Sequence, residues 1–249
     1  MARGFDGATQ YLEYAGAVLT AYPFTFSCWF NVSNVTGDHY LMSIADQSTG
    51  TNYWTLVALG SVAGDPVSFV SRSGGSGNLA NTTTGFSAAT WTHACGVGTS
   101  ATSRNSYING GSVGSNTTSS TPSGLDNTDI GQVHTSGGHI GPPLGSVAEV
   151  GIWAAALSVS EIAALAAGVS PLLVRPASLI GYWPLIGRYS PEIDLKGRAE
   201  MTVTGAVTAV PPRIIYPAGM PVSGRDYAAA GGGPTVPIFD HHYRMLRVA

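Results

Sequence analysis

The sequence has few charged residues and no long hydrophobic run. Asp, Glu, Lys and Arg make up 10% of its 249 residues, against about 25% in ordinary soluble domains. The formal net charge of −3 gives no electrostatic reason to bind nucleic acid or an acidic membrane surface. No run of about 18 apolar residues occurs, because Glu149 and Glu161 interrupt the longest candidate. We therefore expect neither a nucleic-acid partner nor a membrane-spanning segment.

A secretory signal pattern is also missing, and cysteine is scarce. The first residues, Met1 to Asp6, enter a strand-like pattern without the apolar core of about 7–15 residues that a secretory signal needs. The chain holds two cysteines, Cys28 and Cys95. We therefore expect the protein to be made in a cytoplasm, where thiols stay reduced.

Glycine, by contrast, is abundant. The 33 glycines are about twice the usual share, and Ser, Thr and Asn are frequent as well. A length of 249 residues is enough for one large β-sandwich with a hydrophobic core. The composition therefore predicts a neutral, turn-rich, all-β protein.

Residues 145–168 predict a strand followed by one short helix. Apolar and other residues alternate over 145–153, which is the pattern of a half-buried strand. Ser158 and Glu161 have the spacing of a capping box at a helix start. Ile162 and Leu165 lie three residues apart and can face the same surface. We expect this helix to lie flat on a sheet.

Period-2 patterns predict further strands along the chain. In the strand at 24–32, one face carries Phe24, Phe26, Cys28 and Phe30, which predicts that this face is part of the core. The other strands are expected at residues 10–14, 40–44, 53–59, 66–71, 91–97, 104–109 and 129–133.

These segments, taken in order, resemble the laminin-G-like, or concanavalin A-like, jelly-roll family, which includes the pentraxins. The resemblance rests on Phe5-Asp6-Gly7, Phe24 to Phe30, Trp91-Thr92-His93-Ala94-Cys95, Tyr107-Ile108-Asn109-Gly110, Ile130-Gly131-Gln132 and the strand-helix stretch, which together span residues 4–170. It implies an all-β, concanavalin A-like jelly-roll β-sandwich with one short helix.

The segment 179–209 resembles the piece that usually begins such a module. Because domain termini often lie close together, moving this piece to the other end is structurally easy. We therefore expect residues 1–210 to form a circularly permuted sandwich, with 179–209 pairing beside residues 4–14. The alternative, a truncated second module, is too short to bury a core of its own.

The resemblance also raises the question of a disulfide, because pentraxins join the two corresponding strands by one. Cys28 stands one position later than the family pattern, and a shift of one residue moves a side chain to the other face of a strand. We expect buried thiols, with the disulfide as the alternative.

From residue 211 the composition changes to that of an extended arm, 211–249. Prolines and a glycine run prevent regular strands, and the net charge is +2 against −5 for residues 1–210. Many side chains remain apolar, which is unusual for a solvated linker. We expect a partner-binding surface made of Ile214, Ile215, Tyr216, Ile238, Phe239, His241, His242, Tyr243, Met245 and Leu246.

Catalytic residues are not evident. Glycosidases of similar fold need two carboxylates beside the sugar bond, whereas Glu149 is alone on its strand and is expected to point outward or to anchor the backbone. No nucleophile elbow is present either. A non-enzymatic role is therefore favoured over a glycosidase-like one.

Metal binding has weak sequence support. The acidic and amide calcium ligands that the resemblance implies are replaced by Val133, His134 and Thr135. Three aspartates, Asp46, Asp126 and Asp129, are candidates for a weak calcium site or, alternatively, for turn formation. His134 and His139 lack a third ligand in sequence and are interpreted as surface loop residues. No cofactor is expected.

Sugar binding requires an aromatic side chain on an exposed surface. Candidate glycan-binding residues are Tyr40, Tyr53, Trp54 and Tyr107, with Trp29 as a further aromatic, although such residues in sandwiches usually pack in the core.

We predict a non-enzymatic structural or decoration protein of a tailed-bacteriophage virion. Modules of the family that this sequence resembles also occur in phage virions. The arm would attach the protein to neighbouring subunits such as the major capsid protein. We expect a homo-oligomer located on the virion. The alternative is a carbohydrate-binding, lectin-like module that recognises glycans on a host surface.

Overall fold

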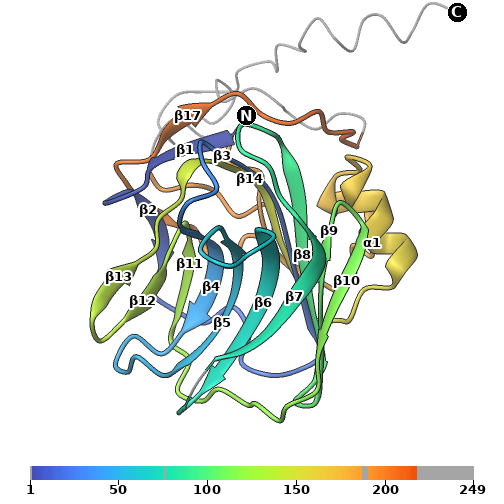
Figure 1. The fold of residues 1–249 in the computed structure, drawn as a ribbon. Coiled ribbons are helices and arrows are strands. Elements are labelled where there is room, and N and C mark those ends of the chain that lie inside the picture. The colour runs from blue at the N-terminus through green and yellow to red at the C-terminus, as the bar shows by residue number, and fades with distance from the viewer. Residues whose placement is uncertain (1, 76, 187–189, 218–249) are drawn as a thin grey trace, which may run out of the picture.

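The protein folds as a sandwich of two antiparallel sheets (Figure 1). The computed structural model describes residues 2–75, 77–186 and 190–217. Strands account for most of the regular structure, and the helix over 159–166 lies outside one sheet. The all-β jelly-roll class predicted from the sequence is confirmed.

Within the described residues, one sheet has eight strands and the other has seven. The first is ordered β10, β9, β8, β3, β14, β1, β17, with β15 beside β14: β1 (Ala2–Asp6), β3 (Phe24–Val32), β8 (Thr92–Ser100), β9 (Ser103–Ile108), β10 (Gly111–Asn116), β14 (Leu144–Trp153), β15 (Leu179–Trp183) and β17 (Val207–Ala209). The second is ordered β16, β2, β11, β4, β5, β6, β7: β2 (Tyr11–Tyr14), β4 (Asp38–Ala45), β5 (Asn52–Leu59), β6 (Pro66–Ser73), β7 (Asn78–Gly85), β11 (Asn127–Ile130) and β16 (Thr202–Thr204). A separate hairpin pairs β12 (Val133–Thr135) with β13 (Gly138–Ile140).

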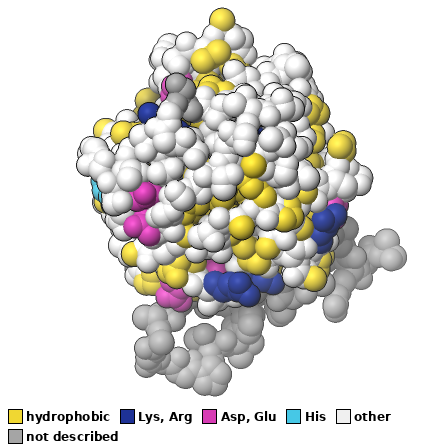
Figure 2. Space-filling model, turned by 90° about the horizontal axis from the view of Figure 1, so that it is seen from below, with side chains coloured by type: hydrophobic (Ala, Val, Ile, Leu, Met, Phe, Trp, Pro, Cys, Tyr) yellow, Lys and Arg dark blue, Asp and Glu magenta, His cyan; other side chains and the backbone are white. Residues whose placement is uncertain are grey.

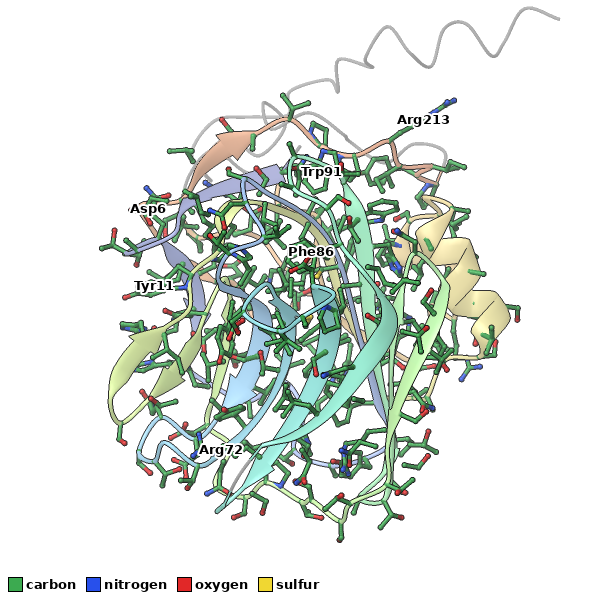
Figure 3. All side chains as sticks on the ribbon, in the orientation of Figure 1. Asp6, Tyr11, Arg72, Phe86, Trp91 and Arg213 are labelled. Carbon is green, nitrogen blue, oxygen red and sulfur yellow. The ribbon has the colours of Figure 1, made fainter. Side chains whose placement is uncertain are left out.

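The core between the sheets is rich in aromatic side chains. Phe24 and Phe26 of β3 point inward, as their alternation predicts, and both are fully buried. The Phe24 ring lies 4.6 Å from the Trp54 ring, and the Phe26 ring lies 5.9 Å from that of Phe69, measured between centroids. Figure 3 shows Phe86 in the same layer between the sheets. Burial of these large rings supplies much of the driving force for folding.

Helix α1 (Val159–Ala166) covers the outer face of the eight-stranded sheet near β8, β9 and β10 (Figure 1). The capping box predicted from the sequence is present, because Ser158 and Glu161 each bond the other's backbone amide. Ile162 and Leu165 are buried in a cluster that includes Trp153 of β14. The helix therefore lies flat on the sheet, and a 3-10 turn (Pro171–Leu173) covers a further part of the same face.

The two cysteines lie on opposite faces of one sheet. Cys28 belongs to the core between the sheets, whereas Cys95 belongs to the cluster beneath α1. In the register of β3 and β8, Cys95 is paired with Ser27 rather than with Cys28. Both thiols are free, and burial raises the pKa of each. The expectation of buried thiols is confirmed.

The C-terminal strands pair beside the N-terminal ones. Strand β16 pairs with β2 and β17 pairs with β1, as expected for this segment. Strand β15 instead pairs with β14. It pairs with residues 150–153 of β14, whereas β1 pairs with residues 144–147 of the same strand. Chain segments from both ends of the described sequence thus complete the same two sheets. The circular permutation relative to other family members stays a prediction.

Charged side chains are sparse on the molecular surface. Figure 2 shows one face on which Lys, Arg, Asp and Glu appear in small separate groups among uncharged atoms. Over the described ranges, no helix combines the length and the hydropathy that a membrane crossing requires.

Candidate functional site

The outer face of the seven-stranded sheet carries a row of polar side chains. Leu12 of β2 is buried in the core, so its neighbours Tyr11 and Glu13 face the other way. Glu13 is paired with Asp129 of β11, which is paired in turn with Ser43 of β4. Antiparallel pairing thus aligns two carboxyl groups and a hydroxyl on adjacent strands.

The β12–β13 hairpin brings two imidazoles to this face. His134 and His139 are directly opposed in the hairpin, so their side chains share one side, with ring centroids 4.2 Å apart. Gly138, at a φ of +98°, allows the tight connection between the strands. Tyr11 stacks on His139, with a centroid distance of 4.2 Å and an interplanar angle of 20°.

Glu13 completes this cluster. Its Oε1 atom lies 3.5 Å from Nδ1 of His134, which also lies 3.4 Å from the side-chain nitrogen of Asn127. Burial and the neighbouring His134 lower the pKa of His139, although Glu13 acts in the opposite direction. Among the described residues, Glu13, His134 and His139 are the one group of three His, Cys, Asp or Glu side chains whose ligand atoms lie within 4.8 Å of one another.

A small pocket adjoins the cluster at the edge between β2 and β16. Its volume is about 190 Å³, and it is lined by Tyr11, Glu13, Ala15, Thr202 and Thr204. Thr202 is paired with Glu13 and Thr204 with Tyr11, so the four polar side chains face outward together. Figure 3 shows Tyr11 at this edge of the molecule. The lining combines an aromatic ring with a carboxylate and two hydroxyls.

Asp129 is a buried carboxyl beside this site. Burial raises its pKa to about 7, and the charge of Glu13 adds to the shift, whereas hydrogen bonds oppose it. The side-chain amides of Gln132 and Asn127 donate to it at 2.7 and 2.9 Å, and the backbone N–H of His134 donates at 3.3 Å. Asp129 therefore holds the connection between β11 and the hairpin.

The three aspartates considered for calcium serve as anchors for turns and loops. Asp46 accepts hydrogen bonds from the backbone and hydroxyl of Ser48, which is the turn role considered from the sequence. Asp126 accepts from the backbone of Gln47. In the described part of the chain, these carboxylates and that of Asp129 do not form a common ligand group.

The aromatic residues considered for glycan binding lie mainly inside the protein. Trp54 is fully buried and donates its indole N–H to the Tyr22 hydroxyl, while Tyr53 and Tyr107 are 7% and 6% exposed. These three rings do not present a face to solvent, because Trp54 lies in the core between the sheets, Tyr107 in the cluster beneath α1 and Tyr53 in a small buried cluster on the outer face. Tyr40 is partly exposed at the margin of a small cluster on the outer face. Trp29 is also partly exposed, and its ring lies edge-on to buried His93.

Glu149 does not point outward, and this corrects the prediction. It is 2% exposed and accepts hydrogen bonds from the hydroxyls of Tyr182, at 2.6 Å, and Tyr216, at 2.5 Å. Its backbone is left-handed, with a φ of +56°, where the register of β14 against β3 shifts between Ala148 and Gly151. Burial raises the pKa of Glu149 to about 7, although both tyrosine bonds lower it.

The first part of the predicted arm lies on the sandwich itself. The backbone of Ile215 bonds to Gly168 at 2.7 Å and to Ser170 at 3.0 Å, and Tyr216 reaches Glu149. Ile214 is partly exposed and Ile215 is 57% exposed. The other predicted partner-binding residues lie outside the described residues: Ile238, Phe239, His241, His242, Tyr243, Met245 and Leu246.

Sequence reasoning missed Tyr11, Glu13, Thr202 and Thr204. The period-2 pattern of each strand was visible, with Leu12 and Val203 between polar neighbours. The family resemblance predicted that 179–209 pairs beside residues 4–14, but it did not give the register that places Thr202 beside Glu13. No local signal indicates that the hairpin lies beside Glu13.

Comparison with known proteins agrees with the observed fold. A model of the concanavalin A-like lectin/glucanases superfamily matches residues 6–163. A search of curated proteins found no sequence that matches the chain.

Solved structures with a similar fold include three carbohydrate-related proteins. A candidate carbohydrate-binding protein from Bacteroides ovatus has a TM-score of 0.61 at 20% identity, over 86% of this chain and 61% of that one. The CBM40 of a Ruminococcus gnavus IT-sialidase, bound to α2,3-sialyllactose, has a TM-score of 0.54 at 12% identity, over 67% and 98%. Domain 4 of a Geobacillus stearothermophilus arabinanase, in complex with arabinotriose, has a TM-score of 0.55 at 20% identity, over 66% and 76%. At these identities the likeness concerns the fold.

The family match covers more than half of the chain, and the two-sheet architecture is that of the family. The chain belongs to the concanavalin A-like lectin/glucanases superfamily.

Proposed function

We propose that the chain is a non-catalytic carbohydrate-binding module and that its sugar site is the pocket between β2 and β16. The observation that carries this proposal is the lining of that pocket. Tyr11 offers a ring face for the apolar side of a sugar, while Glu13, Thr202 and Thr204 offer hydrogen-bond partners for its hydroxyls. The carbohydrate-related neighbours of the same fold add support.

The charge of the pocket favours a neutral sugar. Glu13 is the charged residue among the lining residues described, and none of them is Lys or Arg. In the metal-free pocket a carboxylate repels an anionic sugar of the sialic-acid type, and the described lining has no Lys or Arg to compensate for this repulsion. Neutral oligosaccharides, which are the chemical class of arabinotriose, are therefore the proposed ligands.

The size of the pocket favours recognition of one sugar unit. Its volume of about 190 Å³ lies below the range of about 300–1,000 Å³ that is typical of small-molecule sites. A single ring or chain end fits this space, and the rest of an oligosaccharide would stay in solvent. Binding by one module is therefore weak, and several modules on one particle or cell would strengthen it through avidity.

Carboxylate placement supports a non-catalytic role. Glycosidases place two carboxyl groups on either side of the sugar bond, about 5–9.5 Å apart. Glu13 is the one carboxylate among the described residues that line the pocket. Asp129 is buried within hydrogen bonds to neighbouring amides, so its role is structural.

The test is a glycan array followed by titration of the best neutral ligand. We expect Tyr11→Ala and Thr204→Val to weaken binding at least about tenfold, because the first removes the ring platform and the second a hydrogen bond. Trp91→Ala is the matched control, since Trp91 lies well apart from Tyr11 in Figure 3. Saturable binding that both pocket variants retain would reject this site, and the absence of any glycan ligand would reject the function.

The virion role stays a prediction. Residues 211–217 of the proposed arm lie on their own sandwich, and 218–249 lie outside the described residues. Deletion of 218–249 followed by measurement of particle incorporation tests this role, because undiminished occupancy would show that the arm is not the attachment segment.

A further inference from the structure

Two of the six histidines meet a carboxylate at the surface. His39 and His93 are buried, and His241 and His242 lie outside the described residues. His134 is partly exposed and His139 is exposed, so an ion from the solvent can reach both side chains. Their shared neighbour is Glu13, which comes from a different part of the chain.

The ligand atoms of this trio are close to the spacing that a metal ion requires. In a tetrahedral site with bonds of about 2.0–2.2 Å, ligand atoms lie about 3.3–3.6 Å apart. Glu13 Oε1 and His134 Nδ1 already lie 3.5 Å apart, and all three ligand atoms fall within 4.8 Å of one another. A small side-chain rotation would bring His139 into place, which its exposure permits.

Neighbouring groups contact both rings. Tyr11 stacks on the His139 ring, and the side-chain amide of buried Asn127 lies 3.4 Å from Nδ1 of His134. The Asn127 side-chain oxygen is buried and has no hydrogen-bond partner among the described residues. The Asn127 contact is long and involves the nitrogen that also faces Glu13, so an ion at that nitrogen would displace it, whereas stacking on Tyr11 uses the ring face of His139 and not its nitrogens.

We propose that Glu13, His134 and His139 bind a divalent transition-metal ion of the Zn²⁺ type. Two imidazole nitrogens and one carboxylate oxygen form a donor set that suits Zn²⁺, and water would occupy the fourth position. This proposal does not depend on sugar binding.

A metal ion at this place links two separate elements. Glu13 belongs to β2, and the histidines belong to the β12–β13 hairpin, which pairs with neither sheet. The ion therefore fastens the hairpin to the edge of the seven-stranded sheet. Because the folded chain assembles the three ligands, the metal stabilises the folded state.

The experiment is a calorimetric titration of the tag-free, chelator-treated full chain with ZnCl₂. We expect one ion per chain, and at least about tenfold weaker binding for Glu13→Gln and for His139→Ala. The double variant His241→Ala/His242→Ala is the matched control, and its affinity should equal that of the wild type. At the same concentration, Zn²⁺ should also raise the Tm of the wild type and of this control by more than it raises that of His139→Ala.

Two results would overturn the proposal. One is a wild-type chain that shows no saturable Zn²⁺ binding. The other is Zn²⁺ binding that Glu13→Gln and His139→Ala retain undiminished, which would place the ion elsewhere. Both substituted side chains are at least partly exposed, so circular dichroism of the variants should match that of the wild type. Because Glu13 also lines the pocket, the sugar measurements are made with EDTA, which separates the two tests.

Discussion

Replacing Glu149 by Gln should remove a pH dependence of stability that originates in the interior of the eight-stranded sheet. Glu149 is 2% exposed, and its two carboxylate oxygens accept from Tyr182 and Tyr216. Gln has nearly the same shape, and its oxygen can keep one of these hydrogen bonds. The substitution therefore removes the ionisation while the packing around residue 149 stays in place.

The magnitude follows from the pKa of the carboxyl group. Burial raises it from 4.5 to about 7, which corresponds to about 3 kcal/mol. Between these values the folded chain keeps a proton that the unfolded chain releases, so the contribution is complete below pH 4.5 and is lost as the pH rises through 7. The free energy of unfolding of the wild type, relative to Glu149→Gln, should fall by about 3 kcal/mol between pH 4.5 and 8.5.

The assay is urea denaturation followed by tryptophan fluorescence at several pH values. The difference between the two proteins isolates Glu149, because Asp129 and His93 have shifted pKa values in both. Tyr216→Phe serves as a companion variant, since loss of one donor should cost about 1.5–3 kcal/mol at pH 8.5, where the carboxylate is charged. A difference between wild type and Glu149→Gln that varies by less than about 0.5 kcal/mol over this range would refute the reasoning.

Three further predictions concern the fold. Gly114→Ala should destabilise the protein by about 1–3 kcal/mol in urea denaturation, because the added Cβ would lie 1.9 Å from a backbone oxygen of β7. Gly111→Ala in the same strand is the control: its Cβ would meet open space, so the free energy of unfolding should hardly change. Ser158→Ala should cost about 1 kcal/mol by removing the N-cap, and a thermal melt with an unchanged Tm would contradict this. Cys28 and Cys95 should react with a thiol reagent in denaturant without prior reduction and stay unreactive in the folded chain, whereas a need for reductant would indicate a disulfide.

The local features of the fold could be predicted from the sequence. Phe24 and Phe26 lie in the core because antiparallel strands buried on one face alternate with period 2. The helix start was visible because the capping box is formed by Ser158 and Glu161, which are three residues apart. In each case the signal and the structure that it specifies lie within a few residues.

Glu149 shows why such a pattern can fail. Regular alternation predicts that Val147 and Val150 lie on opposite faces, yet both belong to the core between the sheets. The register shift at Glu149 absorbs one residue and restores the inward direction. The side chain of Glu149 is then covered by Tyr182 and by Tyr216, which comes from a distant segment. The alternation within one strand does not predict these contacts.

The candidate site was hidden for a related reason. Tyr11 and Glu13 resemble ordinary outward residues of a short strand, and Thr202 and Thr204 resemble those of another. Strand pairing across the length of the chain joins them. The sequence predicted that 179–209 lies beside residues 4–14, but not the register that sets Thr202 beside Glu13 and Thr204 beside Tyr11. The aromatic residues chosen instead, such as Trp54, were the large and apolar ones that the core requires.

The most direct test of the sugar site is an NMR titration of the isotopically labelled chain with the neutral oligosaccharide that binds best. We predict saturable chemical-shift changes that centre on Tyr11, Glu13, Thr202 and Thr204. Changes confined to another surface, or no changes at ligand concentrations that saturate the array signal, would contradict the proposed carbohydrate-binding role of this pocket.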